Sequence, residues 1–291
     1  MFTASLMTSN RSRLWQNLLA ATGVLLTAGC LKGPYDKSAA EKKLVEGHQA
    51  TVSDTISGDR QIHYVAVGRR GAPLILFIHG TPGSWHAFAE LMTDQLLLTR
   101  AYMVSVDRPG FGKSGNGRMV TSLEQQAAYL KPVIERESTG GRAVLVGHSL
   151  GAPIAARIAM DYPKLVSGMV LVAPSLDPDL EKPRWYNHLA ASPLIAWAVP
   201  EALAHANQEI MPLSAELAQM LPRWSRIQVP VIVVQGEKDE LVSPANADFA
   251  GRILDGRATV VRVADQGHFI LWKRPGLIRD QILALLPEPA K

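Results

Sequence analysis

The chain has 291 residues, 47% of them hydrophobic, which is enough to bury one large core, and α/β chains of this length commonly form a single domain. The formal net charge is only +4, so nothing in the composition points to nucleic acid. A single cysteine excludes an internal disulfide, and no H-E-x-x-H segment or cysteine pair predicts a metal site.

The first 29 residues are predicted to be a targeting signal rather than part of the fold. Two arginines precede an apolar run over residues 14–26, which ends in Thr27-Ala28-Gly29-Cys30. This pattern resembles a bacterial lipoprotein signal, in which the cysteine after the cleavage site is lipidated. We therefore expect Cys30 to hold the protein at a membrane of the bacterial cell envelope. A plain signal peptide and an uncleaved anchor are the alternatives.

Removal of residues 1–29 takes away Arg11 and Arg13 and no acidic residue. The 30 basic residues fall to 28 against 26 acidic ones, so the net charge falls from +4 to +2. Residues 30–49, rich in Lys, Glu, Ala and Gly, are predicted to be a tether between the lipid and a folded domain over residues 50–288. Leu31 stands where many inner-membrane lipoproteins carry aspartate, which favours the outer membrane.

Apolar strands alternate with helical stretches along the folded part, which predicts a mostly parallel sheet flanked by helices. An antiparallel hairpin over residues 50–57 and 60–67 is expected to feed this sheet. The segment 142–147 is apolar without alternation, as expected of a strand that is buried on both faces. Further apolar strands are predicted over residues 73–78, 169–173, 231–235 and 258–263.

A serine lies in the segment Gly147-His148-Ser149-Leu150-Gly151, between the strand over 142–147 and a helix predicted over residues 150–161. A strand, a tight turn and a helix in this order are the context in which G-x-S-x-G holds a nucleophile. A serine hydroxyl reacts poorly at neutral pH, so it needs a base to take its proton and an acid to orient that base. An ordinary glycine-rich turn is the alternative.

Among the eight histidines, His268 is the best candidate for the base. It lies in a loop after the strand over 258–263 and before the last helix. His79 and His148 lie inside glycine-bearing turns, which favours structural roles. A carboxylate for the acid is available in the turn over residues 236–240, which contains Asp239.

A serine, an acid and a histidine in this chain order, each at a strand end, resemble the catalytic triad of the α/β-hydrolase superfamily. The turn over residues 107–114 is similar to the D-x-x-G-x-G-x-S turn common there, and the resemblance covers roughly residues 50–288. His79-Gly80-Thr81-Pro82 also resembles epoxide hydrolases and haloalkane dehalogenases. Those families carry aspartate where this chain has Ser149, and the difference favours acyl chemistry.

The resemblance implies an α/β-hydrolase fold and a triad of Ser149, Asp239 and His268. Asp177 is a rival acid, because some members place the acid after the preceding strand. The oxyanion of the tetrahedral intermediate needs backbone amides. The amide of Leu150 is one expected donor, and Thr81 is the other, because Pro82 has no N–H.

The resemblance also implies a helical cap over the active site, in the insertion at about residues 175–228. Half of the six tryptophans lie there. Packing on the main domain accounts for most apolar cap residues, and others are expected to roof an apolar pocket. The predicted pocket residues, from the cap and from the loops below it, are Trp85, Phe88, Phe111, Trp185 and Trp197.

The sequence thus predicts a hydrolase that cleaves a hydrophobic carboxylic ester through an acyl-enzyme intermediate. The expected partner is a small-molecule substrate, with no metal and no organic cofactor. Amide, thioester or carbon–carbon bond cleavage by the same triad is one alternative. A catalytically silent binding protein on the same fold is another.

Overall fold

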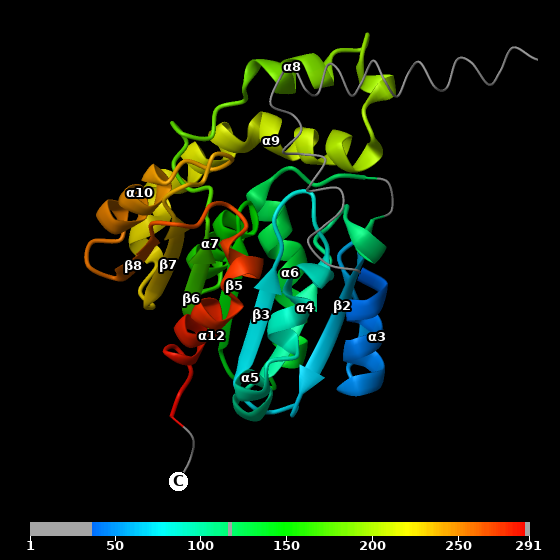
Figure 1. The fold of residues 1–291 in the computed structure, drawn as a ribbon, viewed down its shortest axis with the longest axis vertical. Helices are drawn as coiled ribbons and strands as arrows, with labels where there is room; N and C mark the ends of the chain where they lie inside the picture. The colour runs from blue at the N-terminus through cyan, green and yellow to red at the C-terminus, as the bar shows by residue number, and fades with distance from the viewer. Residues whose placement is uncertain (1–36, 116–117, 289–291) are drawn as a thin grey trace, which may run out of the picture. The chain divides into compact units, whose positions relative to one another are not determined.

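The computed structural model describes residues 37–115 and 118–288, which contain an eight-stranded sheet in the order β1-β2-β4-β3-β5-β6-β7-β8 (Figure 1). The pairs β1–β2 and β2–β4 are antiparallel, and all the other neighbouring pairs are parallel. The predicted α/β class with a mostly parallel sheet is therefore confirmed. The strands are β1 (Thr51–Ser57), β2 (Arg60–Gly68), β3 (Leu74–Ile78), β4 (Tyr102–Val106), β5 (Ala143–His148), β6 (Val166–Val172), β7 (Val231–Gly236) and β8 (Ala258–Val263).

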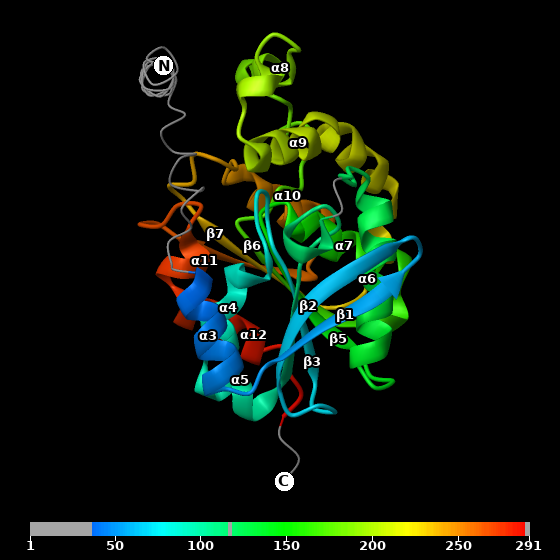
Figure 2. The ribbon, with the colours of Figure 1, turned by 90° about the vertical axis from the view of Figure 1, so that its right-hand side faces the viewer.

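Helices cover both faces of this sheet (Figures 1 and 2). One face carries α6 (Leu123–Glu137), α7 (Gly151–Asp161) and α10 (Ala245–Ile253), and the other carries α4 (Ala89–Met92), α5 (Gln95–Arg100), α11 (Ile270–Lys273) and α12 (Pro275–Leu283). Successive residues of β3 divide between the two cores: Leu76 packs toward α6 and α7, and Phe77 packs toward α4 and α12. Burial on both faces explains why the central strands are apolar without alternation.

Residues 37–47, which are part of the segment 30–49 predicted to be a tether, are helical in the structure. They form α3 (Lys37–Gly47), and Leu44 is fully buried in the core that contains α4 and α12. The carbonyl oxygen of Leu44 also accepts hydrogen bonds from the amides of His48 and Ala50, at 3.1 Å each. This part of the chain therefore belongs to the fold and not to a tether. The predicted signal over 1–29 and Cys30 lie outside the described residues.

The insertion between β6 and β7 is helical, as predicted. It contains α8 (Trp185–Ala191) and α9 (Glu201–Met220), which lie together beyond one end of the sheet (Figure 1). Asn187 and Asn207 exchange two hydrogen bonds of 2.8 and 3.0 Å and so join the two helices. Leu213 and Leu217 of α9 are buried with the core of the main domain, which attaches the cap to the sheet layer.

Within residues 37–115 and 118–288, no helix combines the length and the hydropathy that crossing a bilayer would need.

Candidate active site

Ser149 lies in a sharp turn between β5 and α7. Its φ is 53°, in the left-handed region that a non-glycine residue rarely adopts. The turn requires both glycines of its motif because the backbone approaches so closely: a Cβ atom at Gly147 would lie 2.6 Å from the carbonyl oxygen of Gly151, and one at Gly151 would overlap that of Ile78. The amide of Ser149 donates to Val172 at 2.9 Å, which fixes the turn at the carboxyl end of β6.

Asp239 and His268 form a hydrogen-bonded pair, with 2.9 Å between Oδ2 and Nδ1. An ionised carboxylate only accepts, so Nδ1 of His268 carries the proton and Nε2 is left to accept one. The second carboxylate oxygen of Asp239 accepts from the amides of Leu241 and Val242, at 3.0 and 2.9 Å. The Asp239 side chain has no exposed area, and these bonds compensate its buried charge.

Asp177, the rival acid, makes different contacts. Its carboxylate accepts from the amide of Asp179 at 2.9 Å, and its own amide donates to the buried side chain of Asn246 at 2.8 Å. In this geometry the carboxylate that orients His268 is that of Asp239. Asn246 also donates to Glu181 at 2.9 Å, and burial raises the pKa of that carboxyl, which the sequence analysis did not single out.

His148 connects the serine turn to the histidine loop. Its Nε2 donates to the carbonyl oxygen of His268 at 3.2 Å, and the two ring centroids are 4.9 Å apart. Because His148 precedes Ser149 in the chain, this bond brings His268 to the nucleophile turn. Burial, and secondarily the charge of His268, lowers the pKa of His148 to about 3. His148 is therefore neutral at pH 7.

Of the two predicted oxyanion donors, Leu150 follows Ser149 in the turn, and Thr81 lies in the loop after β3. Gly80, which precedes Thr81, is in direct contact with Ser149 and His148. Within the described part of the chain, the amides of Leu150 and Thr81 donate to no other residue. Backbone amides without a partner are uncommon, and here one follows the strained Ser149 directly and the other follows Gly80, which lies against it. The arrangement can receive a developing negative charge on a carbonyl oxygen.

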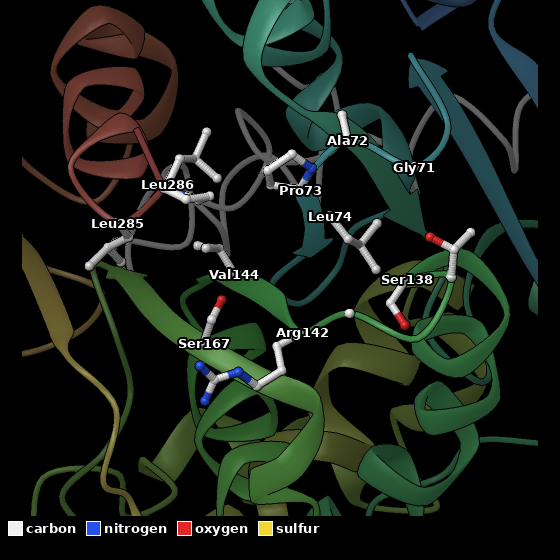
Figure 3. Close-up of a pocket in the computed structure, with 13 residues that line it drawn as sticks. Gly71, Ala72, Pro73, Leu74, Ser138, Arg142, Val144, Ser167, Leu285 and Leu286 are labelled. Atoms are coloured by element: carbon white, nitrogen blue, oxygen red, sulfur yellow. The ribbon is translucent and has the colours of Figure 1, made fainter. Parts of the chain in front are cut away.

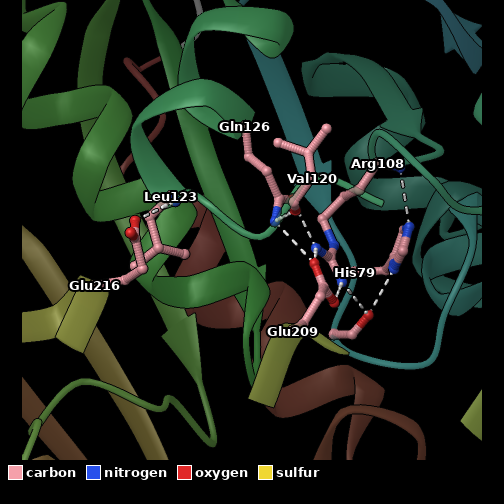
Figure 4. A network of polar contacts seen from close by, with 8 residues as sticks. His79, Arg108, Val120, Leu123, Gln126, Glu209 and Glu216 are labelled. Carbon is pink, nitrogen blue, oxygen red and sulfur yellow. Dashed lines mark hydrogen bonds and ion pairs between the residues drawn. The ribbon is translucent and has the colours of Figure 1, made fainter. Parts of the chain in front are cut away.

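A buried ion pair, which the sequence analysis missed, borders the same loop (Figure 4). Arg108 and Glu209 have side-chain exposures of 0% and 1%, and their closest approach is 2.6 Å. Arg108 follows β4, and Glu209 lies in the cap helix α9. From the sequence, residues 107–114 predicted only a turn. The position of Glu209 inside a helical insertion does not indicate that it pairs with Arg108.

The five predicted pocket residues occupy three environments. Trp85 and Phe88 are buried in the core on the α4 side of the sheet, where Phe88 stacks on Phe77 at 4.8 Å. Trp185 and Trp197 lie on the cap and are 62% and 68% exposed.

Phe111 contacts His79 in the loop that follows β3. Its ring lies edge-on to His79 at 5.5 Å and to His205 of the cap at 6.4 Å. Phe111 therefore lies where the cap meets the loop over residues 79–84, which contains the proposed donor Thr81 and is called the oxyanion loop below.

A cavity of about 600 Å³ opens near the amino ends of the central strands, at the end of the sheet opposite to Ser149 (Figure 3). Its lining includes Pro73, Leu74 and Arg142, which lie where β3 and β5 begin, whereas Ser149 follows the end of β5. The cavity is therefore separate from the candidate site. The described residues also contain no cluster of three or more His, Cys, Asp or Glu side chains suited to a metal ion.

A protein-family model described as "Alpha/beta hydrolase family" matches residues 75–281 of this chain. Over 232 residues the chain is 28% identical to 2-(acetamidomethylene)succinate hydrolase of Mesorhizobium japonicum, covering 68% of this chain and 82% of the relative. Over 115 residues it is 31% identical to Epoxide hydrolase 4 of Mus musculus, covering 38% of this chain. The match spans only 31% of that epoxide hydrolase.

Solved structures share the fold. Cfl2 from Burkholderia cenocepacia superposes with a TM-score of 0.68 at 19% identity, covering 82% of this chain and 96% of that one. A putative lipase from Acinetobacter baumannii superposes with a TM-score of 0.63, also at 19% identity, covering 87% and 96%.

Proposed function

The chain belongs to the alpha/beta hydrolase family, and from this membership we propose that it is a serine hydrolase that cleaves hydrophobic carboxylic esters. The observation that carries the proposal is the Asp239–His268 pair, which is held through His148 against the turn of Ser149. Such an arrangement supplies a nucleophile, a base in the required tautomer and an acid that orients the base.

The reaction begins with attack of Ser149 Oγ on the ester carbonyl carbon while Nε2 of His268 takes the hydroxyl proton. The tetrahedral oxyanion lies against the amides of Leu150 and Thr81. Its collapse breaks the bond to the alkoxy group, which leaves with the proton from His268. Water then attacks the acyl-enzyme by the same sequence, releasing the carboxylic acid and restoring Ser149.

Ser149 is the feature that favours ester cleavage over epoxide or halide chemistry. The epoxide hydrolases and haloalkane dehalogenases that this chain resembles carry an aspartate at the nucleophile position. A serine forms an acyl-enzyme only with a substrate that has a carbonyl carbon. Phe111, at the junction of the cap and the oxyanion loop, supports an apolar substrate group.

Labelling with a fluorophosphonate tests the proposal, because this reagent reacts with activated serines. We expect the wild type to be labelled and Ser149→Ala, with unchanged circular dichroism, to be unlabelled. A panel of matched esters, thioesters and amides then identifies the bond. Absence of labelling and of turnover in a folded wild type would refute the proposal in favour of a silent binding protein.

We also propose that the protein is a lipoprotein of the bacterial cell envelope, anchored through Cys30, with the outer membrane as its site. The support is the segment Thr27-Ala28-Gly29-Cys30 after an apolar run. In bacterial cells fed an alkyne fatty acid, the wild type should be labelled and should sediment with outer membranes. Cys30→Ser should lose the label; a Cys30→Ser protein that keeps it would refute lipidation at this residue.

A further inference from the structure

One peptide unit carries both the carbonyl group that Arg108 binds and the amide proposed to hold the oxyanion. This is the unit between Gly80 and Thr81, which is trans; the cis peptide of the loop follows Thr81. In a trans peptide the C=O and N–H bonds point in opposite directions within one plane. Any group that fixes the Gly80 oxygen therefore also fixes the direction of the Thr81 N–H.

Two donors hold the Gly80 oxygen. Nδ1 of His79 donates to it at 2.7 Å, and Nη2 of Arg108 donates to it at 2.9 Å. Nε2 of His79 accepts from the backbone amide of Arg108 at 3.0 Å. The neutral tautomer with its proton on Nδ1 therefore accounts for both hydrogen bonds of the His79 ring. A guanidinium on the carbonyl also polarises the peptide, which strengthens its N–H as a donor.

The side chain of Arg108 is itself fixed by Glu209 of the cap helix α9 (Figure 4). Its Nη1 and Nη2 donate to the two carboxylate oxygens of Glu209, at 2.6 and 2.9 Å. Gln126 of α6 accepts from Arg108 at 2.7 Å and donates to Glu209 at 2.8 Å. This paired geometry fixes the guanidinium plane. Without Glu209, Arg108 would be a buried cation lacking its counter-charge, and its position would change.

We propose that Arg108 and Glu209 are a positioning pair that aims the Thr81 amide at the oxyanion and makes the oxyanion hole depend on a docked cap helix α9. The inference rests on the proposed serine hydrolase function. Neither residue touches the reacting atoms; both act through the Gly80–Thr81 peptide. Loss of a whole oxyanion donor lowers kcat by about 10² to 10³. Misdirection of one should lower kcat by about tenfold or more.

Glu209→Gln tests the pair, because it keeps the side-chain shape and removes the charge. Glu216→Gln is the matched control: Glu216 also lies on α9 and binds the main domain, through the amide of Leu123 at 2.9 Å, but away from the oxyanion loop. Arg108→Lys is a second variant, which keeps the buried charge but cannot reproduce the two-pronged contact.

The readouts are kcat, KM and the ratio of rates on an ester and on its thionoester, whose sulfur accepts hydrogen bonds poorly. Glu209→Gln and Arg108→Lys should lower kcat at least tenfold with KM within about threefold, and should lower the ester-to-thionoester ratio. Glu216→Gln should keep all three within about twofold.

An unchanged kcat and ratio in a folded Glu209→Gln or Arg108→Lys protein would overturn the inference while leaving the serine hydrolase intact. A reduction in kcat without any change in the ratio would also overturn it, because it would mean general damage to the fold. A wild type that is neither labelled by fluorophosphonate nor active would refute the proposed function and this inference together.

Discussion

Gly80 and Ser149 touch so closely that a Cβ atom at Gly80 would lie 2.9 Å from the Cβ atom of Ser149. The same atom would lie 3.1 Å from Nδ1 of His148. The loop after β3 and the turn after β5 therefore approach each other to a distance that only glycine allows. The spacing between the proposed nucleophile and the proposed Thr81 donor depends on this contact.

Gly80→Ala should separate the two segments. We expect kcat to fall at least tenfold and stability to fall by about 1–3 kcal/mol, the usual cost of overpacking. Gly47→Ala is the control, since nothing lies within 4 Å of a Cβ atom there. Ester turnover and urea unfolding measure both effects; normal turnover in Gly80→Ala would show that the contact does not set the geometry.

Asp239→Asn should lower kcat by about 10³ to 10⁴, because an amide can donate to Nδ1 of His268 and so favour the wrong tautomer. Asp177→Asn should stay within about twofold, since its carboxylate binds the amide of Asp179 instead. Steady-state kinetics on one ester compares the two variants. The opposite ranking would assign the acid to Asp177.

The lowered pKa of the buried His148 predicts that the stability of the protein depends on pH. Its pKa is about 3 in the folded protein and about 6.5 in the unfolded chain. Between these values the unfolded chain binds a proton that the folded protein excludes. The free energy of unfolding therefore falls as the pH falls, by up to about 1.4 kcal/mol per pH unit from this group.

His148→Gln removes the titration and keeps an N–H donor for the carbonyl oxygen of His268. Urea unfolding of both proteins at pH 4, 5, 6 and 7 measures the effect. Stability should fall less steeply with acid in the variant, since the other titrating groups are common to both. Parallel curves would contradict the neutral, buried state of His148.

Leu44→Ala should destabilise the protein by about 2–4 kcal/mol, because Leu44 is fully buried against the main core. Val45, the next residue along the chain, lies on the exposed side of α3. Val45→Ala should therefore lower the free energy of unfolding by less than about 1 kcal/mol. Urea midpoints of the two variants give the comparison. Equal and small losses would return residues 37–47 to the role of a tether.

Local patterns in the sequence predicted much of the fold and of the candidate site. The apolar segment over 142–147 became β5, and the strained turn at Ser149 follows from the two glycines around it. Asp239 and His268 were selected because each follows a predicted strand. In a parallel sheet, the carboxyl ends of the strands meet at one edge, so residues far apart in sequence converge there.

Tertiary structure alone decided the partners of individual side chains. Arg108 and Glu209 are 101 positions apart, and nothing near either one indicates the other. Leu44 lies in a charged segment whose composition resembles a linker, and Phe88 is as aromatic as a pocket residue, yet both pack in the core. Backbone conformation follows from neighbouring residues. Burial and ion pairing depend on which distant surfaces the chain brings together.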